Sequence, residues 1–397
     1  MTDFSRTRDL FHLPDEVIYL DGNSLGPLPK TALARATRTM ADEWGEMLIG
    51  GWNKAQWMAM PGRIGNRIAK LIGAEEGSVV IGDTLSIKVY QALASALDLR
   101  PDRRVVLSDS GNFPTDLYMA EGLLRTLDKG HELKIVAPED VVSAIDETVA
   151  AVMLTHVDYG TGRMHDMAGI TRAAHAAGAI AIWDLAHSAG AVPVDLAGCG
   201  ADFATGCTYK YLNGGPGAPA FIYVRPGLQD SARPALSGWL GHEAPFAFDL
   251  AYRPAGGIER MRVGTPPVIQ MAVLDAALDA WDGVDMTDIR RRSIELSELF
   301  IAEVEAGTDK LALASPRNAK ERGSQVSFRF LQGYAAMQAL IARGIIGDFR
   351  APDRMRFGFC PLYNTPEEIR SAAGALCGIV ETDAWNRPEF LKREAVT

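Results

Sequence analysis

Short buried strands alternate with helical segments through the middle of the chain, and this alternation limits the fold more than any other feature. The apolar runs with the length and composition of strands are 79–81, 104–107, 133–136, 149–154, 179–183 and 220–224. Residues 86–97 and 170–177 show helical spacing, and Gly178 ends the second of them. The alternation predicts an α/β domain with a mostly parallel sheet and helices on both faces. In such sheets ligands bind beyond the carboxyl ends of the strands.

A second, smaller domain is predicted after the alternating region. Residues 227–267 are rich in Gly, Pro and aromatic side chains and are predicted to be irregular. Helical patterns at 268–280 and 286–306 follow, and then strands at 325–330 and 354–359, which is typical of a small α+β domain. A chain of 397 residues is long enough for two or three domains. We therefore expect an N-terminal segment (1–45) that packs with the small domain, a large domain (46–267) and a small C-terminal domain (268–397).

Composition and charge exclude several kinds of partner. The formal charge of −10 argues against nucleic acid and anionic membranes, since both require a basic surface. The four cysteines lack the spacing of a zinc site, which indicates reduced thiols and no metal. No apolar run is long enough to span a bilayer, and the N-terminus lacks a signal peptide. We expect a cytoplasmic protein.

A lone lysine in an aromatic run lies downstream of a strand that ends in an aspartate. Lys210 stands between Tyr209 and Tyr211, and burial there would lower the pKa of its amine and make it a nucleophile. Asp184 ends the strand at 179–183. A lone lysine is usually a solvated surface group, and an aspartate after a strand often caps a helix. Together they match a pyridoxal-phosphate enzyme, in which lysine binds the cofactor covalently and aspartate keeps its pyridine nitrogen protonated.

Other residues occur where a phosphorylated cofactor and an amino-acid substrate would need them. Residues 82–86 join a strand to a helix and could cradle a phosphate, although a single such turn is more often an ordinary cap. Phe113 could stack on a pyridine ring with Asp116 beside it, or the two could form a capped turn. His187 is either a satisfied core histidine or a contact of the ring. Arg356, on an apolar strand, is either paired within the protein or free to bind a substrate carboxylate.

Two motif matches point to other functions and fail on their context. Residues 22–26 fit the G-x-S-x-G elbow of serine hydrolases, but Pro27 and Pro29 obstruct the helix that must follow the serine. Residues 215–220 fit the dinucleotide-binding pattern G-x-G-x-x-A, but they precede a strand instead of following one. Neither a serine hydrolase nor a dinucleotide-binding enzyme is expected.

Six stretches of the chain resemble kynureninase of the bacterial type, a pyridoxal-phosphate enzyme of the fold type I aspartate-aminotransferase superfamily. The Tyr-Lys motif, the Gly-Trp-x-Gly-His motif and the Pro-Leu-Tyr motif are together specific to that family. The matching stretches, in the family's order, are 19–29, 113–116, 183–187, 207–213, 237–242 and 356–364.

The resemblance implies a reaction and a set of site residues. The reaction is the hydrolysis of L-kynurenine, with 3-hydroxykynurenine as a second candidate substrate, to anthranilate and L-alanine by a homodimer with shared active sites. Lys210 and Tyr209 are the implied catalytic residues. The implied cofactor-binding residues are Leu85, Ser86, Phe113, Asp116, Thr155, Asp184, His187, Tyr209 and Lys210, with Trp239 and Thr265 from the neighbouring subunit. Arg356 and Asn23 would bind the substrate carboxylate, and an apolar Trp52 would suit the unsubstituted ring of kynurenine.

Two other reactions are compatible with a fold of this type. A cysteine desulfurase requires a mobile nucleophilic cysteine and usually has a histidine before the lysine, where this chain has Tyr209. A class V aminotransferase would not be expected to carry the three motifs together. A non-catalytic pyridoxal-phosphate regulator would need a basic DNA-binding domain, for which this acidic chain leaves no room.

Overall fold

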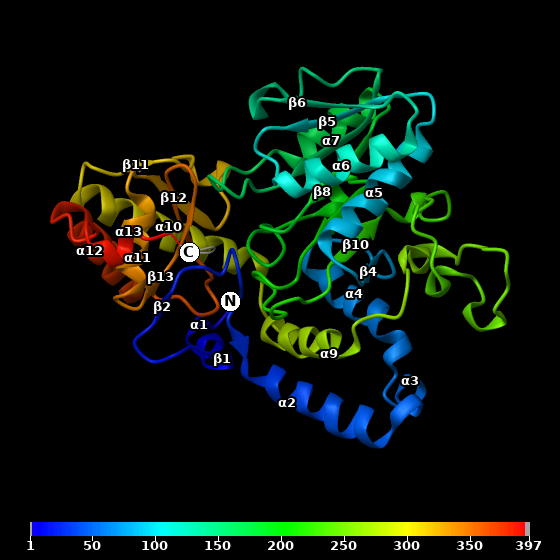
Figure 1. The fold of residues 1–397 in the computed structure, drawn as a ribbon, viewed down its shortest axis with the longest axis horizontal. Helices are drawn as coiled ribbons and strands as arrows, with labels where there is room; N and C mark the ends of the chain where they lie inside the picture. Colours follow the sequence, from blue (N-terminus) through cyan, green and yellow to red (C-terminus); the bar gives the residue numbers. More distant parts are fainter. Residues whose placement is uncertain (1, 394–397) are drawn as a thin grey trace.

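The computed structural model describes residues 2–393, and a seven-stranded sheet forms the centre of its larger lobe (Figure 1). Strands β5 to β9 pair in parallel with their neighbours, and β10 runs antiparallel to both β9 and β4. This confirms the mostly parallel sheet. In spatial order the strands are β4 (Val79–Ile81), β10 (Phe221–Val224), β9 (Phe203–Gly206), β8 (Ile180–Asp184), β7 (Val149–Thr155), β5 (Val105–Asp109) and β6 (Glu132–Val136).

Alternating side chains of the strands face two separate helix layers. In β8, Ile180 and Ile182 belong to the core under one layer, whereas Ala181 and Trp183 belong to the core under the other. The first layer consists of α5 (Leu85–Leu99) and α6 (Pro114–Leu127), and the second contains α4 (Met60–Leu71), α7 (Met167–Ala176) and α9 (Val268–Ala277). The sheet is therefore covered on both faces, as the sequence predicts.

The smaller lobe has its own sheet and its own apolar core. Its antiparallel strands, in spatial order, are β11 (Ala312–Leu313), β12 (Gln325–Arg329), β15 (Arg354–Gly358) and β14 (Asp348–Arg350). Phe300, Phe328 and Phe357 meet in the core of this lobe. Its helices are α10 (Met286–Gly307), α11 (Gly333–Ile341) and α12 (Pro366–Glu381). The small α+β C-terminal lobe is thereby confirmed.

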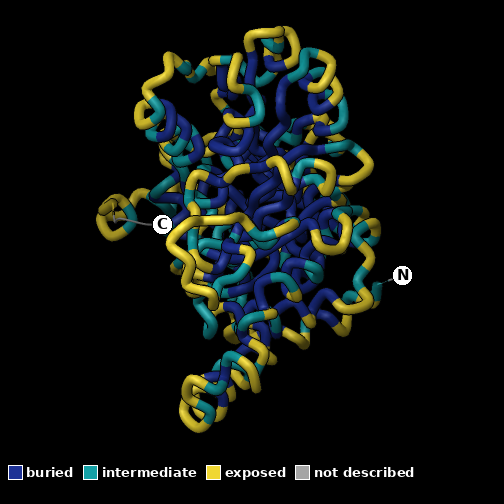
Figure 2. Tube along the Cα trace, turned by 90° about the vertical axis from the view of Figure 1, so that its right-hand side faces the viewer, coloured by how far each residue is buried: buried dark blue, intermediate teal, exposed yellow. Residues whose placement is uncertain are grey.

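The N-terminal segment connects the two lobes and continues into a projecting arm. Strand β2 (Ile18–Tyr19) pairs in parallel with β13 (Ile345–Ile346) of the small lobe, and β1 (Phe11–His12) pairs with β3 (Leu28–Pro29). The arm extends from the body, with much of its surface exposed (Figure 2). It consists of α2 (Lys30–Arg38), the π-helical η2 (Thr39–Glu46), η3 (Leu48–Gly50) and α3 (Gly51–Lys54). The remaining short α-helices of the described residues are α1 (Phe4–Thr7), α8 (Leu196–Cys199) and α13 (Pro388–Leu391).

The domain boundaries at 45 and 267 stay a prediction. Helix α9 packs on α2 and α4, and Met271 and Leu274 lie in the core of the large lobe. We propose that the small domain begins after this helix, near Asp285, which caps α10. Among residues 2–393 no helix is both long and apolar enough to cross a bilayer.

Candidate active site

The carboxyl ends of the parallel strands bring the predicted lysine and aspartate together. Thr155 and Asp184 are register partners at the ends of β7 and β8, and both are buried. Lys210 follows β9 in a loop, half-buried instead of fully buried as its neighbours suggest. Its Nζ lies 6.0 Å from the ring centroid of Phe113 and 5.8 Å from that of Tyr209. The site therefore forms where open α/β sheets bind ligands.

The glycine motif at residues 22–26 has a structural role beside this loop. The Gly26 N–H donates to the Tyr209 carbonyl (2.8 Å). A Cβ atom on Gly26 would lie 2.3 Å from the Lys210 carbonyl oxygen, so no side chain fits there. The loop itself is closed by the N–H of Asn213, which donates to the Lys210 carbonyl (2.9 Å). The N-terminal segment thus packs directly on the backbone that carries the lysine.

Two buried carboxyls beside the lysine lack a full set of partners. Asp184 Oδ1 accepts the Ala186 N–H (2.8 Å), and burial raises the pKa of Asp184 to about 6 while Lys210 opposes the shift. Asp116 is in the first turn of α6 but does not cap it, and its Oδ2 has no hydrogen-bond partner among the described residues. Burial, and then the charge of Asp184, raise the pKa of Asp116 well above its usual range. A bound cation or protonated ring nitrogen would satisfy such a pair.

Aromatic, imidazole and phenol groups surround the same space. Phe113 precedes α6, is 39% exposed and has Lys210 Nζ near its ring. His187 is buried, its Nδ1 has no partner within residues 2–393, and burial followed by the charge of Lys210 lowers its pKa. The pKa of Tyr209 is raised, first by the Cys207 thiol and then by burial, so the phenol keeps its proton at neutral pH and can donate it. A polarised aromatic ligand suits these groups.

Helix α5 offers amide groups for a phosphate. The helical ladder begins where the Lys88 N–H donates to the Thr84 carbonyl (3.1 Å), so the amides of Leu85 and Ser86 have no partner within the helix. Thr84, the residue before the helix, makes no side-chain capping bond. The amides at this helix start suit a phosphate, the two buried carboxyls suit a protonated ring nitrogen, and the exposed ring of Phe113 suits a pyridine ring. Together these groups fit pyridoxal phosphate.

Arg356 is buried at the edge of the small lobe and is paired within the protein. Its Nε donates to Asp348 Oδ1 (2.6 Å), and its Nη1 donates to the Tyr159 carbonyl (2.6 Å). The same carbonyl accepts Gln325 Nε2 (3.0 Å), and Gln325 Oε1 in turn accepts Asn23 Nδ2 (3.3 Å). Asn23 and Arg356 are thereby linked. The Tyr159 ring packs edge-on against Phe113, with 5.1 Å between centroids. Tyr159 therefore connects Arg356 to the surroundings of Lys210.

Three of these linking residues are missed by the sequence analysis. Asp348, Gln325 and Tyr159 have no motif of their own. Asp348 carries a detectable signal, because it is the direct cross-strand partner of Arg356 in the β14–β15 pairing and opposite charges favour such positions. Tyr159 acts through its backbone carbonyl, which any residue type supplies.

Three predicted residues are not brought to the lysine within one protomer. Trp52, in α3, packs edge-on against Trp57 with 5.7 Å between centroids. Trp239 and Thr265 are exposed on the irregular segment 227–267, which appears green to yellow-green at the right of Figure 1. The Leu240 N–H donates to the Val263 carbonyl (3.1 Å), so the stretches that carry the two exposed residues lie next to each other. Their roles stay predictions.

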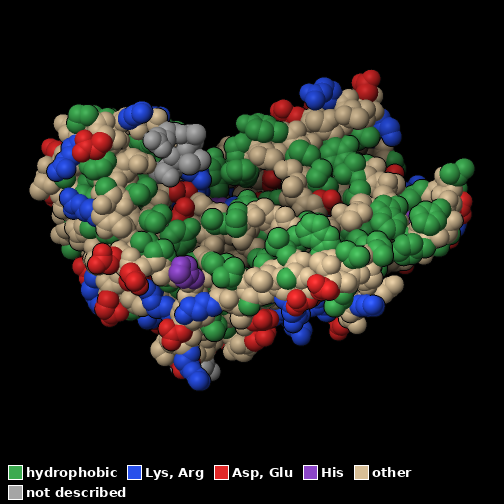
Figure 3. All heavy atoms as spheres, turned by 60° about the horizontal axis from the view of Figure 1, so that its bottom comes forward, with side chains coloured by type: hydrophobic (Ala, Val, Ile, Leu, Met, Phe, Trp, Pro, Cys, Tyr) green, Lys and Arg blue, Asp and Glu red, His purple; other side chains and the backbone are tan. Residues whose placement is uncertain are grey.

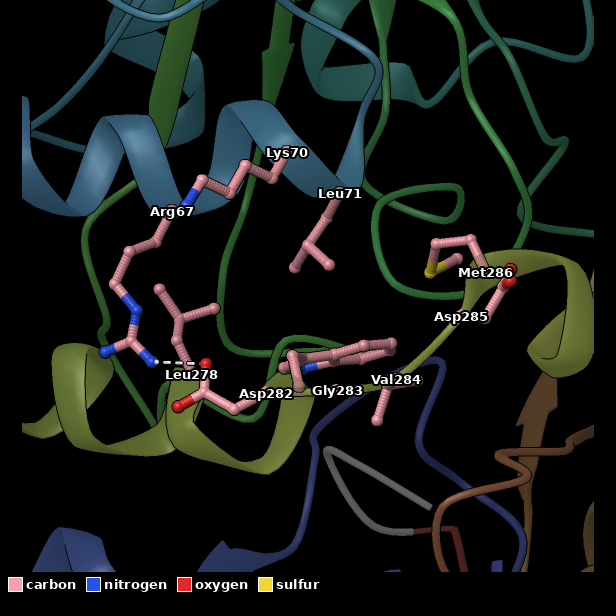
Figure 4. A pocket seen from close by; sticks show the side chains of 10 residues that line it. Arg67, Lys70, Leu71, Leu278, Asp282, Gly283, Val284, Asp285 and Met286 are labelled. Atoms are coloured by element: carbon pink, nitrogen blue, oxygen red, sulfur yellow. Dashed lines mark hydrogen bonds and ion pairs between the residues drawn. The ribbon is translucent and has the colours of Figure 1, made fainter. Parts of the chain in front are cut away.

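A separate pocket of about 570 Å³ lies between α4 and the segment that leads into α10 (Figure 4). Its arginine, Arg67, is already neutralised by Asp275 (3.1 Å) and Asp279 (2.8 Å). None of the residues lining it is a predicted site residue. The chemistry of the chain therefore concentrates at the strand ends and not in this pocket.

Comparisons with known proteins identify relatives of this chain. A family model described as the kynureninase C-terminal domain matches residues 289–376. Kynureninase from Pseudomonas fluorescens is 51% identical, over 98% of this chain and 95% of that protein. Kynureninase from Burkholderia pseudomallei (strain 1106a) is 50% identical over the same shares.

Solved structures show the same fold at low sequence identity. The apo cysteine desulfurase from Thermococcus onnurineus NA1 has a TM-score of 0.81 at 21% identity, covering 96% of this chain and 99% of that one. The cysteine desulfurase CsdA from Escherichia coli has a TM-score of 0.80 at 19% identity, with the same coverage. The fold is that of fold type I pyridoxal-phosphate enzymes, as predicted.

Proposed function

The chain belongs to the kynureninase family, and from that membership we propose that it hydrolyses L-kynurenine to anthranilate and L-alanine with pyridoxal 5′-phosphate as cofactor. The observation that carries the proposal is the placement of Lys210, Asp184 and Phe113 around one space at the strand ends, with Arg356 linked to it. The reaction adds water across the bond between Cβ and the γ-carbonyl carbon of the substrate, and its two products account for all atoms.

Pyridoxal phosphate, when bound, supplies an electron sink that stabilises negative charge on the substrate carbons next to the amine. Asp184 would keep the ring nitrogen protonated, and Phe113 would stack on the ring. The amides of Leu85 and Ser86, with the Tyr209 hydroxyl, would hold the phosphate. Asp116, His187 and Thr155 would contact the ring and its substituents.

The protein groups that move protons are the lysine and the phenol. Lys210 would hold the cofactor covalently, and its free amine would remove the proton from the substrate Cα. Tyr209, whose raised pKa keeps it protonated, would pass the proton released by the added water on to the substrate, with the phosphate completing the proton chain. Arg356 and Asn23 hold the α-carboxylate, which fixes Cα within reach of Lys210.

The thiols argue against a cysteine desulfurase, the reaction of the structural neighbours. Cys207 and Cys377 are buried, and burial raises the pKa of each. Burial also raises the pKa of Cys360 to about 12. Cys199 is half-buried, and burial raises its thiol pKa too. A desulfurase requires an accessible thiolate near the cofactor, and none of these four residues provides one.

The test of the proposal is release of anthranilate, which is fluorescent, from L-kynurenine by the purified protein with pyridoxal phosphate. We expect kcat/KM for L-kynurenine to exceed that for 3-hydroxykynurenine by about tenfold, because an added hydroxyl in an apolar setting at Trp52 costs roughly 1–3 kcal/mol. Cofactor absorbance without anthranilate release would refute the proposed reaction. Equal kcat/KM for the two substrates would refute the preference alone.

We further propose that the enzyme is a homodimer in which Trp239 and Thr265 reach the phosphate of the partner subunit. Large apolar side chains are exposed on the arm and on the segment that carries Trp239. Hydrophobic side chains gather on the face of the molecule that Figure 3 shows. Patches of this kind mark protein interfaces. The exposed residues are Leu33, Met40, Trp44, Leu48 and Ile49 on the arm, and Trp239, Phe246, Phe248, Leu250 and Tyr252 on the segment.

A mixing experiment tests the shared site. Lys210→Ala and the double variant Trp239→Ala/Thr265→Ala are each expected to be nearly inactive. Random exchange of their subunits should restore activity to about a quarter of the wild-type level, because half of the dimers are mixed and each has one intact site. Native mass spectrometry verifies the exchange. Mixed dimers without regained activity would show that each protomer forms its site alone.

A further inference from the structure

An acid on the neighbouring strand holds the arginine proposed to bind the substrate carboxylate. Arg356 is 2% exposed and Asp348 is 3% exposed, and the two face each other in the β14–β15 pairing. Arg356 Nε donates to Asp348 Oδ1 (2.6 Å), and Arg356 Nη2 donates to Asp348 Oδ2. A two-point contact of this kind fixes the plane of the guanidinium group.

One N–H hydrogen of Arg356 has no acceptor among residues 2–393. Besides Asp348, Nη2 donates to Ser24 Oγ (3.2 Å) and Nη1 donates to the Tyr159 carbonyl (2.6 Å). A guanidinium group has five N–H hydrogens, and these contacts use all but one on Nη1. Nη1 contacts Tyr159, and the Tyr159 ring packs against Phe113. Phe113 in turn lies near the amine of Lys210.

We propose that Asp348 is a positioning residue, which orients Arg356 so that its free Nη1 hydrogen meets the substrate α-carboxylate. The proposal rests on the proposed function, because it assigns Arg356 to that carboxylate. It differs from a simple two-point clamp between arginine and substrate, since the two-point face of the guanidinium is occupied by Asp348. A second donor to the carboxylate must then come from another group, and Asn23 is linked to the same Tyr159 carbonyl through Gln325.

The surrounding charges keep Asp348 ionised for this role. Burial would raise the pKa of Asp348, but the hydrogen bonds and charge of Arg356 hold it below the usual value. Asp348 also accepts Ser24 Oγ (2.7 Å) and Arg350 Nη2 (2.9 Å). Burial and the charge of Asp348 raise the pKa of Asp21 to about 7. Of the two carboxyls in the cluster, Asp348 is thus the one that stays negative near neutral pH.

Two opposite effects of removing the acid can be distinguished. If Asp348 positions Arg356, its loss turns a buried guanidinium away from the site and weakens carboxylate binding. If Asp348 instead competes with the substrate for Arg356, its loss frees the two-point face and strengthens binding. The sign of the change therefore decides between positioning and competition.

The experiment compares Asp348→Asn with wild type and with Asp383→Asn, an exposed aspartate of the same lobe. We expect Asp348→Asn to raise KM for L-kynurenine about tenfold or more while kcat stays within about threefold. Binding of L-alanine, followed by the absorbance of the bound cofactor, should weaken by a similar factor. The affinity for pyridoxal phosphate should not change, because Asp348 contacts none of the proposed cofactor-binding residues. Asp383→Asn should behave as wild type.

Unchanged or tighter binding of L-kynurenine and L-alanine by Asp348→Asn would overturn the proposal. If this variant does not fold, Asp348→Glu replaces it, and we expect the longer side chain to displace Arg356 and raise KM in a folded protein. Loss of the fold in both variants would make Asp348 purely structural and also overturn the proposal. A wild-type enzyme that releases no anthranilate would refute the proposed function alone, since the L-alanine titration still measures carboxylate binding.

Discussion

Lys210→Ala is expected to lower kcat for anthranilate release by about 10⁴-fold or more, because the variant loses both the covalent anchor of the cofactor and the base at Cα. The visible absorbance of the cofactor bound through the lysine should disappear. No other lysine is placed to replace it: Lys88, the one fully buried lysine among residues 2–393, is tied to Asp83 (3.1 Å), just before α5, and to Gln91 (3.0 Å) on α5. The measurements are anthranilate fluorescence and the absorbance spectrum of the purified variant.

A matched control separates this effect from a general loss of positive charge. Lys134 is exposed on β6, and Lys134→Ala should leave both the spectrum and kcat unchanged. Lys210→Ala should still retain pyridoxal phosphate without a covalent bond, because the amides of Leu85 and Ser86 and the ring of Phe113 remain. A variant that kept the lysine-bound absorbance or released anthranilate at more than about a hundredth of the wild-type rate would contradict the assignment of Lys210.

The sheet was largely predictable from the sequence because every strand except the edge strand β6 is buried on both faces. Such strands appear as short continuous apolar runs, as at Val79–Ile81 and Val149–Thr155. An apolar run does not reveal β9 (Phe203–Gly206), because this strand contains only one large apolar residue. It is buried because the neighbouring strands and helices cover it. Helix α6 was also missed, since Phe113 and Pro114 at its start are equally typical of a turn.

Only the part of the candidate site that lies at the strand ends was predictable from the order of the strands along the chain. Asp184 ends a strand, and Lys210 and Phe113 each follow one, so all three lie at the same end of the sheet. Two of the partners of Arg356, Tyr159 and Ser24, come from other parts of the chain, and no local pattern predicts these contacts. Tyr159 comes from the large lobe, Ser24 from the N-terminal segment and Asp348 from the small lobe. Trp239 and Thr265 would reach a cofactor only across the proposed dimer interface, which no local pattern describes, and Trp52 packs against Trp57 on α3.

Asp184→Asn is expected to lower kcat/KM by about 10²- to 10⁴-fold and yet to stabilise the cofactor-free protein. Asparagine cannot keep a pyridine nitrogen protonated, so the electron sink is lost. Its Oδ1 still accepts the Ala186 N–H, and the fold is retained. The visible spectrum with cofactor and the anthranilate assay measure the first effect. Asp383→Asn, on the surface, should show neither effect.

The stability gain follows from the raised pKa of Asp184 and must depend on pH. Burial raises this pKa from 3.8 to about 6 in the folded protein, so ionisation of Asp184 destabilises the fold. The stability present below about pH 4, where the carboxyl is protonated in both states, is lost as pH rises through about 6. The variant has no such loss, so its free energy of unfolding should exceed that of wild type by roughly 1–3 kcal/mol at pH 8 and by little near pH 4. Urea unfolding of both cofactor-free proteins across this range measures the difference, and a gain independent of pH would show that the Asp184 charge is not its cause.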